Sequence, residues 1–118
     1  MTARMLSEHF SADEMHCPCC GQSIDPAFLE MLEQLRQAFG RPLRVSSASR
    51  CQEHNAKVKG SPRSMHLKGR AADLACLNAE DHFRLVDLAM RLGFTGIGTA
   101  ATFVHVDNRE GPPKLWTY

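Results

Sequence analysis

Three residues of the types that commonly bind a metal ion, two histidines and one aspartate, lie far apart in the chain. His66 and Asp73 belong to the segment Ser-Met-His-Leu-Lys-Gly-Arg-Ala-Ala-Asp (residues 64–73), and His105 belongs to Phe-Val-His-Val-Asp (residues 103–107). Neutral imidazole and carboxylate are ligands that Zn²⁺ accepts, and three of them leave the fourth tetrahedral position open. A chain that uses all three must fold so that both segments meet at one point. This requirement constrains the fold more than any other feature of the sequence.

Length and charge limit the class of protein. The chain has 118 residues, of which 43% are hydrophobic, and this predicts one domain over residues 1–118. The 14 Lys and Arg residues and 13 Asp and Glu residues give a formal net charge of +1. Because no strong positive field would attract a polyanion, nucleic acid is not the expected partner.

No segment is apolar over the length that a membrane span requires. The first ten residues also lack the apolar run of a secretory signal, because Arg4, Glu8 and His9 interrupt them. We therefore expect synthesis in the cytoplasm without a signal peptide, and no membrane partner.

Hydrophobic periodicity predicts two main helices. Asp25 and Pro26 fit the cap and first turn of a helix that continues until Gly40. A second amphipathic helix is predicted over residues 79–92, ended by Gly93. Its buried side is expected to contain Phe83, Val86, Leu88, Ala89 and Leu92. The exposed face of the first helix is expected to contain Glu30, Glu33 and Arg36.

Short strands are predicted to carry the candidate ligands. Residues 71–75 are apolar and bounded by charged residues, as is typical of a buried strand, and Asp73 would project from it. Residues 102–107 alternate as in a strand, so His105 and Asp107 would share a face. Weaker patterns predict a strand in 43–47, helical turns in 50–59, a short strand in 93–101 and an irregular segment at 111–113.

The pattern Ser-x-His-x-x-Gly-x-Ala-x-Asp, which ends at Asp73, resembles the signature of the zinc D-alanyl-D-alanine carboxypeptidases. Relatives of that family include vancomycin-resistance D,D-dipeptidases, phage L-alanyl-D-glutamate endolysins and Hedgehog signalling domains. Residues 45–50 are similar to the family's Ser-Gly-Tyr-Arg segment, and His105 matches the histidine on its later strand. The order and spacing agree over most of the chain, and the ends look similar to small phage and bacterial members.

The resemblance implies a Hedgehog/DD-peptidase-like α+β fold, with a small, mainly antiparallel sheet packed with the two helices. It implies that His66, Asp73 and His105 bind Zn²⁺, and that Arg50 anchors a substrate carboxylate or carbonyl. A guanidinium suits a carboxylate because it offers a planar fork of donors. The candidate substrate-binding residues are Arg50, His54 and Ser64, of which Ser64 could equally cap a loop.

The chain departs from well-known members of the family at the general base. Those members keep an acid or a histidine two or three residues before the last ligand, where this chain has Phe103 and Thr102. Neither side chain takes up a proton at neutral pH. The nearest carboxylate is Asp107, on the face of His105. We expect Asp107 to act either as the catalytic base or as the partner that orients a ligand imidazole.

The cysteines and the last aromatic residues leave alternatives open. Cys17, Cys19, Cys20 and Cys51 could bind a second, structural metal, form a disulfide to Cys51 outside the cell, or remain thiols. Cys76 is expected to be a small buried hydrophobic residue. Trp116 and Tyr118 could cover the groove or close the core, and the core is favoured for Trp116.

The resemblance implies a zinc metallopeptidase that hydrolyses peptidoglycan stem peptides, as a D,D-carboxypeptidase or as an endopeptidase of the endolysin type. Zinc lowers the pKa of bound water to about 7 and so provides a nucleophile near neutrality. Without a signal peptide, we expect release to the cell wall by a phage or prophage route. The alternative function is a non-catalytic zinc-containing module that binds wall peptides or a phage-tail partner. We expect a monomer.

Overall fold

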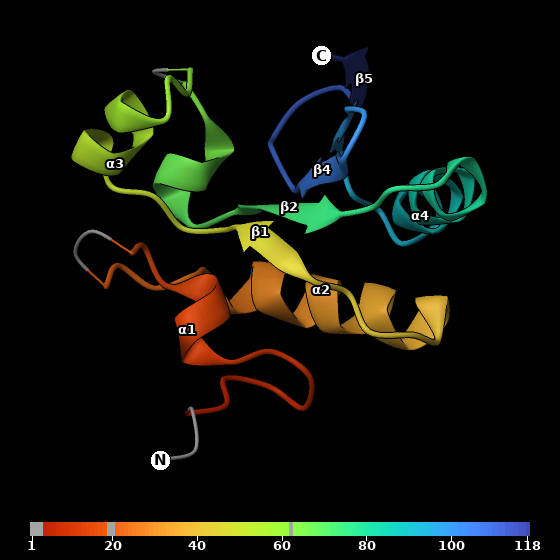
Figure 1. The fold of residues 1–118 in the computed structure, drawn as a ribbon, viewed down its shortest axis with the longest axis horizontal. Helices are drawn as coiled ribbons and strands as arrows, with labels where there is room; N and C mark the ends of the chain where they lie inside the picture. The colour runs from red at the N-terminus through yellow and green to blue at the C-terminus, as the bar shows by residue number, and fades with distance from the viewer. Residues whose placement is uncertain (1–3, 19–20, 62) are drawn as a thin grey trace.

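A five-stranded sheet forms the centre of the structure, a computed structural model that describes residues 4–18, 21–61 and 63–118 (Figure 1). The strands are β1 (Val45–Ser47), β2 (Ala71–Ala75), β3 (Gly96–Thr99), β4 (Phe103–Asp107) and β5 (Lys114–Thr117). They lie in the order β1-β2-β4-β3-β5, and only β3 and β5 pair in parallel. The prediction of an α+β fold with a small, mainly antiparallel sheet is therefore confirmed.

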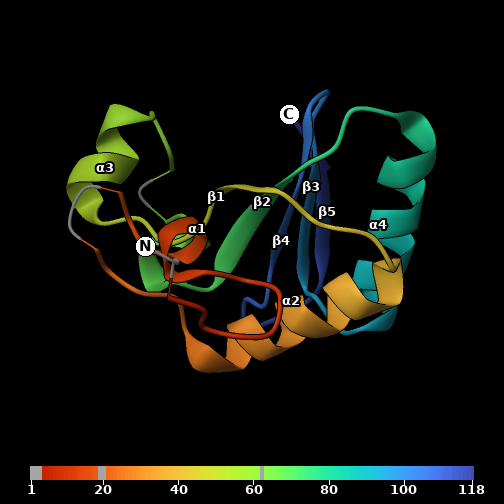
Figure 2. The ribbon, with the colours of Figure 1, turned by 60° about the horizontal axis from the view of Figure 1, so that its bottom comes forward.

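Two long helices, α2 (Pro26–Phe39) and α4 (Ala79–Arg91), confirm the predictions from periodicity. The Asp25 carboxylate accepts a hydrogen bond from the Phe28 N–H at 3.0 Å, and Gly40 ends α2 in the left-handed conformation at φ 78°. The shorter helices are α1 (Ala12–Met15), α3 (Gln52–Lys57) and the 3₁₀ helix η1 (Met65–Lys68). Figures 1 and 2 show α3 and α4 at opposite ends of the molecule, with the sheet between them.

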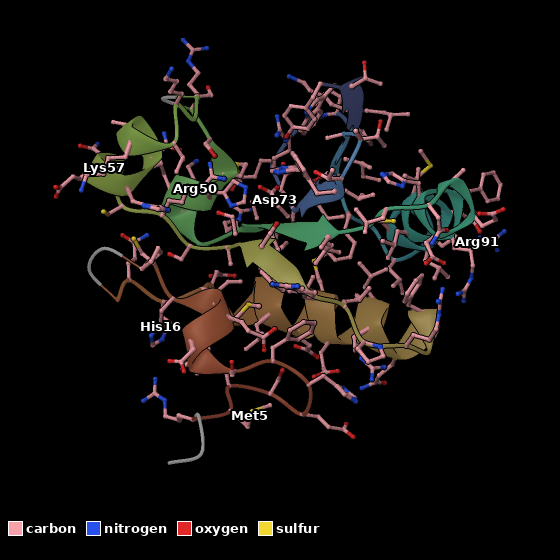
Figure 3. All side chains as sticks on the ribbon, viewed as in Figure 1. Met5, His16, Arg50, Lys57, Asp73 and Arg91 are labelled. Carbon is pink, nitrogen blue, oxygen red and sulfur yellow. The ribbon has the colours of Figure 1, made fainter. Side chains whose placement is uncertain are left out.

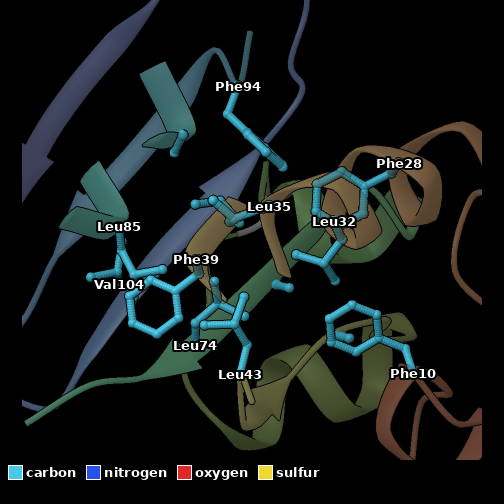
Figure 4. Close-up of a cluster of buried hydrophobic side chains, with 14 of the residues drawn as sticks. Phe10, Phe28, Leu32, Leu35, Phe39, Leu43, Leu74, Leu85, Phe94 and Val104 are labelled. Atoms are coloured by element: carbon cyan, nitrogen blue, oxygen red, sulfur yellow. The ribbon is translucent and has the colours of Figure 1, made fainter. Parts of the chain in front are cut away.

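The hydrophobic core lies between α2, α4 and one face of the sheet (Figure 4). Phe28, Leu32, Leu35 and Phe39 enter it from α2, Leu85 and Ala89 from α4, and Ala72, Leu74, Val104 and Val106 from the sheet. Side chains alternate between the two faces of a strand. Because Val104 and Val106 of β4 face the core, His105 and Asp107 face the other side of the sheet. Asp73 of β2 faces that side too, because its neighbours Ala72 and Leu74 face the core.

The predicted buried side of α4 is partly wrong. Phe83 is 75% exposed, whereas Leu85, which the prediction left out, is 1% exposed. Successive helix residues are rotated by about 100°, so Leu85, Ala89 and Leu92 fall within one narrow sector and Phe83 lies far outside it. The helix turns this sector to the sheet and leaves the Phe83 ring in solvent.

Long-range contacts add one strand and correct one other prediction. Residues 111–113 are irregular, as predicted, and the residues after them form β5 beside β3, which was not predicted. Glu33 is not on an exposed face: its carboxylate accepts hydrogen bonds from the Ser7 hydroxyl at 2.9 Å and the His9 N–H at 2.7 Å. Burial alone would raise the pKa of the Glu33 carboxyl, but the hydrogen bonds of His9 and Ser7 hold it below its ordinary value. These contacts fasten the N-terminal segment to α2.

No helix within the described part of the chain has the length and apolar character needed to cross a membrane.

Candidate metal centre

A tight turn brings His66 to the start of β2. The Ser64 hydroxyl accepts a hydrogen bond from the His66 N–H at 3.2 Å, and this caps η1. Gly69 then ends η1 in the left-handed conformation at φ 66°, where a Cβ would also lie only 2.9 Å from the Ser23 carbonyl oxygen. Only glycine fits both conditions, and this explains why the motif has glycine between its histidine and its aspartate.

The sheet brings the second histidine to the same point. Asp73 of β2 lies directly opposite His105 of β4 in the antiparallel register. The Asp73 Oδ1 atom is 3.2 Å from His66 Nε2 and 3.0 Å from His105 Nδ1. All three side chains are buried, and their candidate ligand atoms lie within 4.8 Å of one another. The structure therefore brings together the three residues that the sequence predicts as ligands.

The geometry of this group fits a zinc ion. Ligand atoms about 2.0 to 2.1 Å from a tetrahedral ion lie about 3.3 Å from one another, which is close to the two distances around Asp73. Each imidazole also has a hydrogen-bond partner on its other nitrogen. His66 Nδ1 is 2.6 Å from the Ala48 carbonyl oxygen, and His105 Nε2 is 2.7 Å from Asp107 Oδ2. Such partners orient the ring and leave the opposite nitrogen for the metal.

Electrostatic interactions keep the Asp73 carboxylate in the ionic form that suits a cation. Burial alone would raise the pKa of the Asp73 carboxyl, but hydrogen bonds with His105 and His66 hold it well below its ordinary value. Burial alone would lower the pKa of His105, but hydrogen bonds with Asp107 and Asp73 raise it. Asp73 is thus anionic at neutral pH, as a candidate ligand of a cation must be.

Asp107 lies behind His105, away from solvent. Its side chain is 0% exposed, and the Arg109 guanidinium contacts both carboxylate oxygens, at 3.0 Å from Nε to Oδ1 and 2.6 Å from Nη2 to Oδ2. The Arg109 N–H donates a further hydrogen bond to Oδ1 at 3.1 Å. Two roles were expected for Asp107: catalytic base, or partner that orients His105. A carboxylate held in this way fits the orienting role better.

Arg109 and Gly96 were not recognised as site residues from the sequence. Gly96 pairs with Asp107 across β3 and β4, and a Cβ on Gly96 would overlap the Asp107 carboxylate. The spacing His-x-Asp-x-Arg over residues 105–109 was the signal for Arg109, because alternate residues at a strand end can lie on one side. No local signal marks Gly96, since its function depends on a neighbouring strand.

Arg50 lies beside the candidate metal ligands, and Figure 3 shows it next to Asp73. Its Nη2 atom donates to Asp73 Oδ2 at 3.3 Å, its Nη1 to Asn55 Oδ1 at 3.3 Å and its Nε to the Ser47 hydroxyl at 3.0 Å. All three nitrogen atoms of the guanidinium therefore already have protein partners. Arg50 holds the second oxygen of Asp73 while His66 and His105 share the first.

A cavity of about 490 Å³ opens over the three ligands. Arg50 and Ser64 line it, whereas His54 is not among the described residues that do. Trp116 also lines the cavity, with its ring 5.2 Å from that of His105 and 4.8 Å from the Arg109 guanidinium carbon. The expectation that Trp116 completes the core is therefore wrong: β5 carries its ring over the site instead.

The cysteines contribute no second metal group among the described residues, where the only cluster of potential ligands is His66, Asp73 and His105. The Cys51 N–H donates to the Cys17 sulfur at 3.3 Å, and no disulfide is formed between them. Cys19 and Cys20 lie outside the described residues, so the alternatives for this cluster stay open. Cys76 is buried, as expected, and burial raises the pKa of its thiol.

Comparison with known protein families identifies the family of this chain. The model of a protein family described as peptidase M15 matches residues 8–107, a range that includes the three candidate ligands and Asp107. No curated protein is similar enough to the chain to count as a relative.

Proposed function

Because the chain belongs to the peptidase M15 family and is thus a zinc-dependent metallopeptidase, we propose that it hydrolyses peptide bonds in the stem peptides of peptidoglycan. The observation that carries this proposal is the buried group of His66, Asp73 and His105 beneath an open cavity. Three protein ligands with an open fourth position are typical of catalytic zinc sites, whereas structural sites have four. We further propose that the sheet and helices form the Hedgehog/DD-peptidase fold.

The residues around the ion have separate roles in this proposal. The chemistry that zinc supplies when bound is a lowered pKa of water and a polarised scissile carbonyl. His66, Asp73 and His105 hold the ion, and the Ala48 carbonyl and Asp107 fix the two imidazole rings. Arg50 fixes Asp73 and presents its remaining N–H groups to a substrate carbonyl. Ser64 keeps η1 in place. Phe103 and Trp116 line the same cavity with apolar surface.

The proposed activity is tested with purified protein and defined muropeptides. We expect release of new amino groups that stops when a chelator removes the metal and returns when zinc is restored. Mass spectrometry of the products then identifies the bond, and with it carboxypeptidase or endopeptidase action. One bound zinc per chain without hydrolysis of any stem peptide would contradict the proposal and favour a binding module.

Replacement of Asp107 by asparagine separates its two candidate roles. If Asp107 orients His105, zinc affinity should fall about 10- to 100-fold. If Asp107 is the base, kcat should fall about 10²- to 10⁴-fold while zinc affinity stays the same. We expect the first result, measured by competition with a chromogenic chelator. Asp87→Asn, an exposed change on α4, is the matched control and should alter neither quantity.

The place of action follows from the same proposal. A stem-peptide hydrolase acts on the cell wall, and we propose that a phage or prophage route delivers this one as a monomer. Activity against purified cell walls, together with sedimentation at the mass of a single chain, tests both statements.

A further inference from the structure

The cavity over the candidate metal ligands carries an excess of positive charge. The basic residues that line it are Arg50, Lys59, Arg63 and Arg109, whereas Asp73 is the only acidic residue among the described lining residues. Arg50 is paired with Asp73, and Arg109 with Asp107 beneath the cavity. Lys59 and Arg63 have no acidic partner within 4.0 Å among the described residues. The unpaired positive charges of Lys59 and Arg63 therefore remain at the edge of the cavity, called the rim below, in addition to the charge of a bound metal.

The position of this rim is fixed by buried contacts. Asn55 of α3 is 4% exposed; its Nδ2 donates to the Ser61 carbonyl at 2.9 Å, and its Oδ1 accepts from Arg50 at 3.3 Å. A Cβ on Gly60 would overlap the Asn55 side chain. Gly60 and Ser61 are thus tied through Asn55 to Arg50, and through Arg50 to the candidate ligand Asp73.

The backbone at Lys59 is unusual for a lysine. Its φ is 58°, and it is the only non-glycine residue with positive φ among the described residues. This left-handed conformation is unfavourable for a residue with a Cβ, and glycine would adopt it more easily. Lys59 ends α3, because the Gly60 N–H donates to the Asn55 carbonyl at 2.8 Å and the Lys59 N–H donates to the Ala56 carbonyl at 3.1 Å. Here the conformation places a lysine, with its charge, at the rim of the cavity.

We infer that Lys59 and Arg63 bind a carboxylate of the substrate. The enzyme thereby selects peptides that place a free carboxylate beside these two residues. This inference rests on the proposed function and names the substrate feature that the site recognises. Arg50 is less suited to this role because its three nitrogen atoms already bind Ser47, Asn55 and Asp73. The side chains of Phe103, Trp116 and Tyr118, which also line the cavity, are uncharged, and Arg109 beside Trp116 is paired with Asp107, so the selection is left to the rim.

Three matched stem peptides test the inference and identify the carboxylate. One has all carboxylates free, one is amidated at the C-terminus, and one is amidated at the side chain of its diamino acid. With the zinc-loaded protein, we expect one of the two amidated peptides to have a KM about 10-fold higher than that of the free peptide, with little change in kcat. Added salt should reduce this difference in KM. Equal KM values for all three peptides would overturn the inference.

The double variant Lys59→Gly/Arg63→Gln should lose this discrimination, so that free and amidated peptides have the same KM. Glycine relieves the strained backbone at residue 59, so the variant should fold. Lys57→Ala/Arg91→Ala removes two positive charges from exposed pairs outside the cavity and should keep the discrimination. A double rim variant that still discriminates would refute the assignment of Lys59 and Arg63.

A binding measurement separates this inference from the proposed function. If the wild-type protein hydrolyses none of the three peptides, the proposed function fails, and calorimetric titration of the same peptides still measures their affinity. About 10-fold tighter binding of the free peptide, lost in the rim variant, would then support the carboxylate site by itself. Equal affinities for the three peptides would overturn it.

Discussion

His66→Ala should abolish peptidase activity because it removes one of three ligands from the metal. Apparent zinc-binding free energies of about 10 to 16 kcal/mol in four-ligand sites correspond to about 3 kcal/mol per ligand, so zinc affinity should fall about 10²-fold or more. His66 Nε2 lies 3.2 Å from Asp73 Oδ1, and no other described histidine or cysteine approaches this group. No neighbouring side chain can therefore replace the lost ligand.

Calorimetry of unfolding checks this prediction without reference to activity. Zinc binds the native state, so it should raise the melting temperature of the wild-type protein and leave that of His66→Ala almost unchanged. His66→Ala also leaves a cavity where the imidazole was, and this affects the melting temperature independently of zinc. Asp73→Asn keeps the shape of its side chain and is therefore the second variant. A zinc-dependent rise of equal size in all three proteins would show that the metal binds elsewhere.

Gly96→Ala should destabilise the protein by about 3 kcal/mol and weaken zinc binding, although alanine is ordinarily the better residue in a strand. The new methyl group would occupy the space of the Asp107 carboxylate, which is fully buried and bound to Arg109 and His105. Movement of this carboxylate would release the His105 ring from its hydrogen bond. Scanning calorimetry and chelator competition measure the two effects.

Gly98→Ala provides the matched control on the same strand. Gly98 lies opposite His105, but a Cβ there would meet the rings of Trp116 and Tyr118 rather than Asp107. We expect Gly98→Ala to change the shape of the cavity and to raise KM, while zinc affinity stays within a few-fold of that of the wild-type protein. If both glycine variants bind zinc as tightly as the wild-type protein, Asp107 does not control the position of His105.

The parts of the fold that the sequence predicts well are those with a local cause. The helix α2 has its cap, its proline and its terminal glycine within the chain segment itself, and β2 is apolar apart from Asp73. The strand β5 was missed because Lys114–Thr117 has mostly exposed side chains and gains its pairing only from β3. Glu33 was misplaced for a similar reason, since its partners Ser7 and His9 come from a distant segment.

The same distinction applies to the site. The pattern around His66 and Asp73 is contiguous in the sequence, and the structure brings these residues together with His105 as expected. The position of Asp107 on the face of His105 follows from strand alternation, and Arg109 follows it by two residues, but the burial of the Asp107 carboxylate also depends on Gly96 of the neighbouring strand β3. The unpaired charges of Lys59 and Arg63 are visible only after Arg50 and Arg109 are seen to have partners.

The position of Trp116 determines what optical spectroscopy can report about this protein. Trp116 and Tyr118 are its only tryptophan and tyrosine, and their ring centroids lie 6.5 Å apart on the last residues of the chain, beside the cavity. Intrinsic fluorescence therefore arises almost entirely from the mouth of the site and hardly at all from the core around α2. An unfolding curve followed by fluorescence records the release of β5, whereas backbone circular dichroism records the whole fold. The two curves coincide only if the edge strand and the core melt as one cooperative unit.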